Sequence, residues 1–280
     1  TASAWINDLS GRFWFGRILY CNTGEKVGAI LKSSFLSDIG KVRKVNEDSV
    51  GLYQNQKQIT LGLVADGIGG NRGGDVASAM VVQHLGYLFE ESTFETVAQA
   101  YEWLQKQVQV ENDLLIQKGK QYPDLEGMGS TLVLILIDSA NCIIANIGDS
   151  RGYRLRNNEL QQISRDHSLV NELIKQGAIT KEEAVNHPQK NVIVKTLGIN
   201  HDAQMDHYAL KVEPGDLFLL CTDGLSKLVA EAKIKVILTA PGSLEEKCQQ
   251  LITQARVNGG DDNITALLVA ADESGERRCE

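Results

Sequence analysis

The sequence lacks the features that mark several common classes of protein. Among its 280 residues, no apolar run approaches the roughly 20 residues that a helix needs to cross a bilayer. The first residues also lack the basic flank and the continuous apolar core of a secretory signal. We therefore expect a protein that has no membrane span and works in the cytoplasm.

Metal and redox motifs built on cysteine or histidine are also missing. The five cysteines are scattered and form no Cys-x-x-Cys pair, so we expect reduced thiols rather than disulfides or a zinc knuckle. The five histidines do not have the His-Glu-x-x-His spacing of zinc proteases. Any metal site must therefore use other side chains.

Nucleic-acid and nucleotide signatures are absent as well. The formal net charge is -8 and no basic run is present, which argues against a nucleic-acid partner. No G-x-x-x-x-G-K-[ST] sequence occurs, which excludes a Walker-type nucleotide loop. The sequence carries no signal for a particular oligomeric state.

What the sequence does contain is a regular alternation of strand-like and helical segments. This alternation runs from about Ser34 to Ala271 without a linker rich in proline, glycine or serine. With 42% hydrophobic residues, the chain can bury a substantial core. We predict one domain over residues 34–272, an extension over residues 1–33 and a polar tail over residues 273–280.

Several predicted strands follow one another directly, as in residues 131–156, so antiparallel hairpins fit better than a strict βαβ repeat. We predict an α+β fold in which two antiparallel sheets pack together and helices lie outside them. The predicted strands are 49–54, 59–66, 131–137, 142–147, 152–156, 204–210, 217–221 and 264–270, and the predicted helices are 75–90, 94–118, 169–176, 181–186, 231–238 and 244–258.

The first 33 residues do not follow this periodic pattern. They contain Trp5, Phe13, Trp14 and Phe15 within a short stretch. Two hypotheses fit them: an edge strand added to a sheet, or a segment that docks a partner.

Acidic residues gather in five short segments near the ends of strand-like runs. Taken alone, the first segment is compatible with a solvated loop, and strand-end Asp-Gly pairs are common in ordinary turns. The five segments are SDIGKVRKVNED (37–48), VADGIGGNRGG (64–74), IGDSR (147–151), CTDGL (221–225) and GGDDNIT (259–265).

The joint occurrence of the five segments is more informative than any one of them. Carboxylates that converge without partners repel one another, which raises their pKa values and lowers stability. Divalent cations remove that penalty. Carboxylate and carbonyl oxygens suit Mg²⁺ or Mn²⁺, whereas Zn²⁺ prefers histidine and cysteine. The residues therefore favour a dinuclear magnesium or manganese centre.

Taken in order, these segments resemble the PPM family of protein phosphatases, also called the PP2C type, and especially its bacterial members. The ordered motifs are S-D-x-G-x-x-R-x-x-N-E-D, A-D-G-x-G-G, G-S-T, G-D-S-R, L-C-T-D-G-L and G-G-x-D-N-x-T, over about residues 34–271. The resemblance implies an αββα sandwich, with two Mn²⁺ or Mg²⁺ ions at one end of the paired sheets.

The resemblance also implies roles for individual residues at the two metals. Asp66 would bridge both ions, and Asp223 and Asp262 would complete the first site. The backbone carbonyl of Gly67 would bind the second ion directly.

Further residues are implied around this pair of metals. Glu47 or Asp48 would hold the second ion through water. Arg43 would grip the substrate phosphate, which suits its planar fork of donors. Asp149 matches the aspartate that helps to hold a third, weaker metal in bacterial members.

The sequence departs from the pattern of the animal-type family members at the position of the candidate proton donor. Animal-type members carry a histidine directly after the Asp-Gly pair as a candidate general acid, and this chain has Ile68 there. His167 is a substitute candidate, against the alternative that it fixes a local turn.

The implied reaction is hydrolysis of phosphoserine and phosphothreonine by direct attack of a metal-bridging hydroxide. Phosphorylated proteins would be the substrates, and a Ser/Thr kinase would oppose the enzyme. The alternatives are a catalytically weak module that binds a kinase or phosphoprotein, and a regulatory protein that docks through its aromatic N-terminal segment. The spacing of the cysteine phosphatases and the D-x-D-x-T nucleophile motif are absent.

Overall fold

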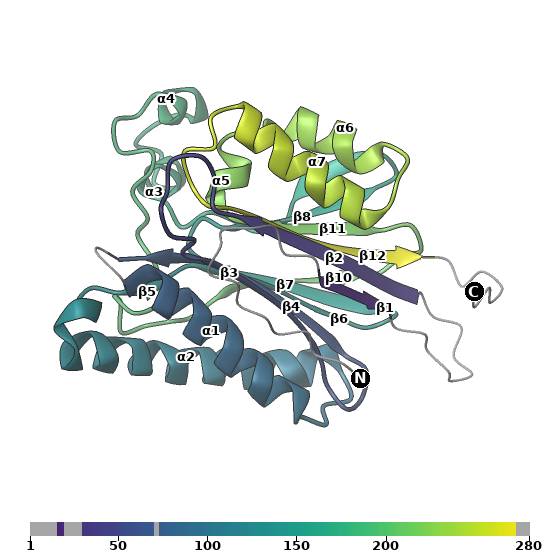
Figure 1. Ribbon diagram of the computed structural model, residues 1–280, viewed down its shortest axis with the longest axis horizontal. Coiled ribbons are helices and arrows are strands. Elements are labelled where there is room, and N and C mark those ends of the chain that lie inside the picture. The colour runs from purple at the N-terminus through teal and green to yellow at the C-terminus, as the bar shows by residue number, and fades with distance from the viewer. Residues whose placement is uncertain (1–15, 20–29, 70–72, 273–280) are drawn as a thin grey trace.

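The chain folds into two antiparallel β-sheets that pack face to face, with helices on both outer faces (Figure 1). The computed structural model describes residues 16–19, 30–69 and 73–272. These layers confirm the predicted αββα sandwich. The first sheet has the order β1 (Gly16–Leu19), β2 (Ile30–Asp38), β12 (Ile264–Asp272), β11 (Leu217–Cys221), β8 (Arg151–Arg156) and β9 (Glu159–Gln162).

The second sheet is built from the middle of the chain, and its neighbouring strands are also antiparallel. A two-residue strand, β5 (Gly129–Ser130), pairs with the end of β4. The main order is β10 (Asp206–Lys211), β7 (Asn141–Ile147), β6 (Leu132–Ile137), β4 (Thr60–Ile68) and β3 (Asp48–Gln54).

Helices cover the outer face of each sheet (Figure 1). The second sheet is covered by α1 (Gly73–Glu90) and α2 (Val97–Gln121), which the 3₁₀ helix η1 (Pro123–Leu125) follows. The first sheet is covered by α6 (Glu231–Thr239) and α7 (Leu244–Val257). Three shorter helices complete the set: α3 (Leu169–Lys175), α4 (Lys181–Val185) and α5 (Asp223–Ser226).

Local sequence explains where α7 begins. The Ser243 hydroxyl accepts a hydrogen bond from the backbone N–H of Glu246, and the Glu246 carboxylate accepts one from the N–H of Ser243. This reciprocal capping box satisfies two backbone donors at the start of the helix. It fixes the helix that packs against β2 and β12.

Strand β6 shows why the sequence pattern of the central strands is continuously apolar. All six of its residues are buried, because one face meets the helix layer and the other meets the opposite sheet. Leu132, Leu134 and Leu136 pack in the core beneath α1 and α2. Val133 and Ile135 pack between the sheets, where Phe218 and Leu267 face them. Side chains that alternate between two buried faces leave no polar position on the strand.

The structure adds elements that the sequence pattern did not predict. Strand β2 has the sequence ILKSSFLSD and pairs with β12. Its buried Ser33 and Ser34 interrupt the apolar pattern, so the sequence did not predict this strand. The expected domain boundary at residues 33 and 34 falls inside this strand. Strand β9 and helix α5 were also missed, because four residues are too few to show a period.

Part of the N-terminal extension is described. Strand β1 pairs with β2 at the edge of the first sheet, as one of the two hypotheses for this region expected. The four aromatic residues at positions 5, 13, 14 and 15 and the tail at 273–280 lie outside the described residues. Within the described part of the chain, no helix is both long enough and apolar enough to span a membrane.

Candidate active site

Strand register brings the acidic segments together at one end of the sandwich. Asp66 lies near the end of β4, and the register of the β3–β4 pair sets Asp48 opposite it. Strands β11 and β12 are antiparallel neighbours, so Asp223, just after β11, approaches Asp262, just before β12. Asp149 follows β7 in the second sheet. Both sheets therefore contribute carboxylates to one end.

The electrostatics of Asp66 show that these carboxylates share a site. Burial raises the pKa of Asp66 well above its ordinary value, and the charges of Asp48, Asp223, Asp149 and Asp262 raise it further. Charges perturb one another in this way only at short range. Asp66 is therefore the centre of a group of acids that repel one another.

Asp48 is buried with only half of its carboxylate satisfied. Its Oδ2 accepts hydrogen bonds from the hydroxyls of Thr222, at 2.8 Å, and Thr265, at 2.7 Å. Its Oδ1 is buried and has no hydrogen-bond partner. Burial raises the pKa of Asp48 to about 7, even though the two hydroxyl contacts lower it. Oδ1 of Asp48 is therefore free to act as a metal ligand inside the site.

Asp149 shows the same shortage of partners. It is buried, and its Oδ1 has no hydrogen-bond partner. Burial and the charge of Asp223 raise the pKa of Asp149 to about 6, while Lys227 lowers it. The Lys227 ammonium group lies 3.3 Å from Oδ2 of Asp149 and also contacts Oδ2 of Asp223.

Gly67 sits where the backbone is tightly packed beside Asp66. Its N–H donates to the carbonyl oxygen of Glu47 at 3.0 Å. A Cβ at Gly67 would lie 2.0 Å from the carbonyl oxygen of Gly74, at the start of α1. Glycine is therefore required here by close approach of the two backbones. The Glu47 carboxylate lies against Gly74, and burial raises its pKa.

Arg43 reaches the acidic cluster from the loop between β2 and β3. Its Nη2 lies 2.9 Å from Oδ1 of Asp262, and its Nη1 lies 3.7 Å from the Glu47 carboxylate. The side chain is 45% exposed. The guanidinium group therefore stands at the border of the cluster and solvent, where an incoming anion could contact it.

The donor set fits hard divalent cations. The clustered side chains present carboxylate oxygens; Asp48 and Asp149 are buried, and one oxygen of each lacks a hydrogen-bond partner. Among the described residues, no group of three or more acidic, histidine or cysteine side chains is arranged so that these side chains alone could hold a metal ion. Mg²⁺ and Mn²⁺ accept backbone carbonyls and water beside one or two carboxylates, so they suit such a site.

Comparison with known proteins gives the family. Residues 41–268 match the profile of protein phosphatase 2C. The chain belongs to the protein phosphatase 2C family. It is 42% identical over 240 residues to the serine/threonine phosphatase stp of Listeria welshimeri, with 85% of this chain and 95% of the relative covered.

A second relative and a solved structure agree with this assignment. The chain is 40% identical over 243 residues to the protein phosphatase PhpP of Streptococcus pneumoniae, with 87% of this chain and 98% of the relative covered. The structure of the S. agalactiae serine/threonine phosphatase superposes on this chain with a TM-score of 0.83 at 38% sequence identity. The superposition covers 86% of this chain and 100% of the other. The resemblance noted in the sequence motifs is confirmed.

Asn263 is a residue beside the acidic cluster that the sequence analysis did not single out. Its Nδ2 donates to the carbonyl oxygens of Ile39 and Val45, both at 3.0 Å, and its Oδ1 accepts from the N–H of Glu47 at 2.8 Å. The side chain thus fastens the loop that carries Arg43 to the start of β12. Its place in the G-G-x-D-N-x-T motif was the available signal.

Thr131 has a similar part on the other sheet. Its hydroxyl accepts a hydrogen bond from the backbone N–H of Asp66 at 3.0 Å and shares another with the Ser150 hydroxyl at 2.8 Å. The backbone N–H of Thr131 also donates to the carbonyl oxygen of Asp66. The G-S-T and G-D-S-R motifs therefore hold the backbone of the central aspartate.

His167 takes part in local contacts between two loops. Its Nδ1 accepts a hydrogen bond from the N–H of Gly148 at 3.2 Å, and its Nε2 lies 3.3 Å from Oδ2 of Asp206. The side chain is buried, and burial lowers its pKa. Both ring nitrogens are engaged in joining two loops, as the alternative hypothesis expected.

Two further acids, one within the first acidic segment and one outside the five segments, are paired with arginine. Asp38 contacts the guanidinium of Arg256 and accepts from the N–H of Gly40. Asp166 is held by Arg151, with a shortest distance of 2.7 Å. These carboxylates stabilise the loops around the site, and their partners explain why they are not available to metal.

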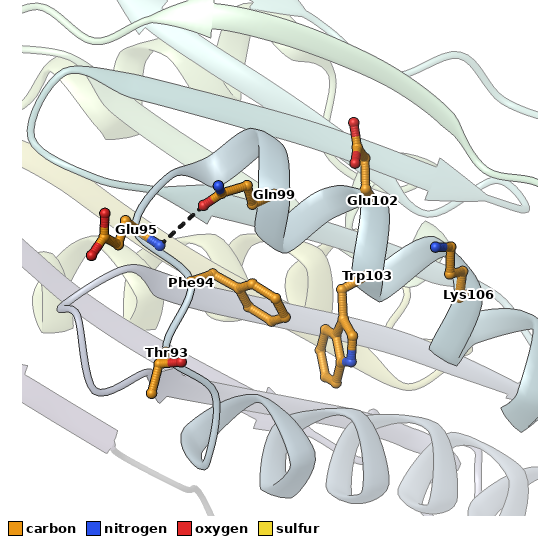
Figure 2. A pocket seen from close by; sticks show the side chains of 7 residues that line it. All are labelled: Thr93, Phe94, Glu95, Gln99, Glu102, Trp103 and Lys106. Atoms are coloured by element: carbon orange, nitrogen blue, oxygen red, sulfur yellow. Dashed lines mark hydrogen bonds between the residues drawn. The ribbon is translucent and has the colours of Figure 1, made fainter.

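The hollow along the start of α2 is not part of this site. Its volume is about 560 Å³. Figure 2 shows Phe94 and Trp103 among the side chains that line it. The acidic cluster lies near the start of α1, and the hollow lies beyond the C-terminal end of the same helix. An 18-residue helix is roughly 27 Å long. The two regions are therefore separate.

Proposed function

We propose that this chain is a divalent-metal-dependent phosphatase that removes phosphate from phosphoserine and phosphothreonine in proteins. The observation that carries the proposal is the mutually repelling set of Asp66, Asp48, Asp149, Asp223 and Asp262, of which Asp48 and Asp149 are buried. Relatives named as serine/threonine phosphatases support the substrate class. The alternative of a catalytically weak binding module has no observation in its favour.

We assign the metal-binding roles as follows. Two Mn²⁺ or Mg²⁺ ions would be held by Asp66, with Asp223 and Asp262 as further residues of the first site. The Gly67 carbonyl would belong to the second site. When bound, such ions lower the pKa of coordinated water and so supply the nucleophile that attacks phosphorus. The bound charge also reverses the local sign of the acidic site for an anionic substrate.

Other residues hold the second ion and the phosphate. Glu47 and Asp48 would hold the second ion through water, and the hydroxyls of Thr222 and Thr265 orient the Asp48 carboxylate. Arg43 binds the substrate phosphate. Its exposed guanidinium exchanges the Asp262 carboxylate for two phosphate oxygens, a pairing that matches its planar fork.

The leaving serine or threonine oxygen needs a proton, because an alkoxide is a poor leaving group. Ile68 has no proton to give, and His167 has both ring nitrogens engaged. We assign the proton to a water molecule that Asp149 positions. Asp149 and Asp223 are also the pair to which we assign a third, weaker cation.

The cellular setting follows from the substrate. A phosphatase that acts on phosphoserine and phosphothreonine opposes a Ser/Thr kinase, and we place both in the cytoplasm. The free, buried thiols of Cys142, Cys221 and Cys248 are compatible with a reducing compartment.

The deciding experiment compares peptides that carry phosphoserine, phosphothreonine or phosphotyrosine. We expect release of phosphate from the first two when Mn²⁺ or Mg²⁺ is added, and loss of release after exhaustive chelation. Restoring the metal should restore the rate. Full turnover without metal would exclude the proposed mechanism.

A further inference from the structure

One lysine enters the acidic cluster from a short helix. Lys227 directly follows α5, four residues after Asp223, and this spacing places the two side chains on the same side of a helical turn. Its ammonium group contacts Asp223 and reaches Asp149 at 3.3 Å. Asp223 follows a strand of the first sheet and Asp149 a strand of the second. Lys227 therefore joins the two sheets across the site.

Asp149 depends on this lysine for its opposite charge. The aspartate is only 5% exposed, and its Oδ1 has no hydrogen-bond partner. A buried carboxylate in this state is unfavourable unless a cation balances it. Lys227 supplies that cation, while the unpartnered Oδ1 remains available as a further donor atom.

The lysine and a metal ion would compete for the same oxygens. Both need the space between the Asp149 and Asp223 carboxylates, and two cations a few ångströms apart repel each other strongly in a partly buried site. The Lys227 side chain is 39% exposed. Its ammonium group can therefore swing into water when another cation takes its place.

We propose that Lys227 is a built-in cation that holds Asp149 and Asp223 together in the metal-free protein and weakens binding of a third divalent ion between them. This inference rests on the proposed function, because it concerns the weaker metal of the same site. It assigns Lys227 a positioning role. The lysine sets how much metal is needed to fill the third position without itself contacting substrate.

The test is a Mn²⁺ titration without substrate, in which electron paramagnetic resonance counts free Mn²⁺. Lys227→Met keeps the length of the side chain and removes its charge. We expect this variant to bind the third Mn²⁺ about tenfold more tightly than the wild type, because a nearby positive charge is gone. Lys227→Arg should resemble the wild type. Lys233→Met, on the exposed surface of α6, is the matched control for loss of a lysine.

A second measurement guards against a purely structural effect. In chelator, Lys227→Met should unfold at lower urea concentration than the wild type, and adding Asp149→Asn should remove most of that loss, since the two residues are partners. Lys227→Gln provides a second neutral variant, and circular dichroism checks its fold.

The outcomes separate this inference from the proposed function. Equal Mn²⁺ affinities in Lys227→Met, Lys227→Gln and wild type, with wild-type phosphatase activity intact, would overturn the role of Lys227 alone. A wild-type protein that binds no Mn²⁺ and hydrolyses no phosphopeptide would overturn the proposed function itself.

Discussion

Strand β11 has an aspartate just outside each end, and the two have opposite surroundings. Asp216, before the strand, is held by Arg156 through two contacts of 2.6 Å and accepts a hydrogen bond from the N–H of Glu213. Asp223, after the strand, lies among other acids and meets a lysine shared with Asp149. One end of the sandwich thus has its buried charge balanced by arginine.

The difference separates acids whose charge is balanced within the fold from acids that keep an unpartnered oxygen. A carboxylate with a bidentate guanidinium partner needs nothing further, because its charge and lone pairs are used. Asp48 and Asp149 each keep an unpartnered oxygen while buried. That arrangement lowers the stability of the metal-free protein, and the divalent cations that we propose for the site would remove the penalty.

The largest expected effect is on catalysis at the acidic end. Asp66→Ala, Asp223→Ala and Asp262→Ala should each lower kcat on phosphopeptides by about 10³-fold or more, since each removes a proposed ligand of an ion that would contribute several kcal/mol to the transition state. Steady-state kinetics with saturating Mn²⁺ measures this. Wild-type rates in folded variants would show that the metal assignment is wrong.

The next effect contrasts the stability of the two ends. Asp216→Ala leaves Arg156 without its buried partner and should lower the free energy of unfolding by about 3 kcal/mol. In chelator, Asp66→Asn should instead raise it, because the substitution removes a charge that its neighbours repel. Urea unfolding of both variants measures the contrast. A loss of stability in both would remove the distinction between the two kinds of acid.

A smaller effect is the dependence of stability on pH. The folded-state pKa is about 7 for Asp48 and about 6 for Asp149, above the ordinary value of 3.8. Their contribution to stability is therefore present below about pH 4 and is lost as pH rises through about 6 to 7. We expect the melting temperature of the metal-free protein to fall over this range.

Two controls identify the groups responsible for this pH dependence. Mn²⁺ should suppress the fall in melting temperature, because it binds the ionised carboxylates. Asp48→Asn should flatten it, since the amide does not ionise in this range. Differential scanning fluorimetry follows both. A melting temperature that rises with pH in chelator, with and without Asp48, would contradict the prediction.

The sequence predicted the architecture because apolar runs and their spacing are local signals. Strand β6 and helix α7 are examples, with continuous burial in one and a capping box in the other. Strand β2 escaped because its buried serines satisfy contacts with distant segments; for example, the Ser37 hydroxyl meets that of Thr265 at 2.8 Å. Such contacts depend on tertiary structure and leave no local pattern.

The prediction of the candidate site has similar limits. The resemblance carried by the motifs pointed to Asp66, Asp223 and Asp262, but the motifs could not separate Asp38, which pairs with Arg256, from acids that have no arginine partner. The contact of Lys227 with Asp149 was equally hidden, because the two residues lie far apart in sequence and meet only when the two sheets pack.

The smallest expected effect concerns two arginines that differ as the two ends of β11 do. Arg156 is 20% exposed and bonded to Asp216, Glu213 and a backbone carbonyl, whereas Arg43 is 45% exposed beside Asp262. Arg43→Ala should therefore raise KM for phosphopeptides about tenfold, or about 1.4 kcal/mol, with little change in kcat, because it removes phosphate binding shared by ground and transition states. Lys44 is a neighbouring exposed cation, and Lys44→Ala should change KM by less than about twofold, because a single surface charge contributes little. A fall in kcat alone would place Arg43 in the chemical step, and equal effects of both variants would reduce its role to general attraction of anions.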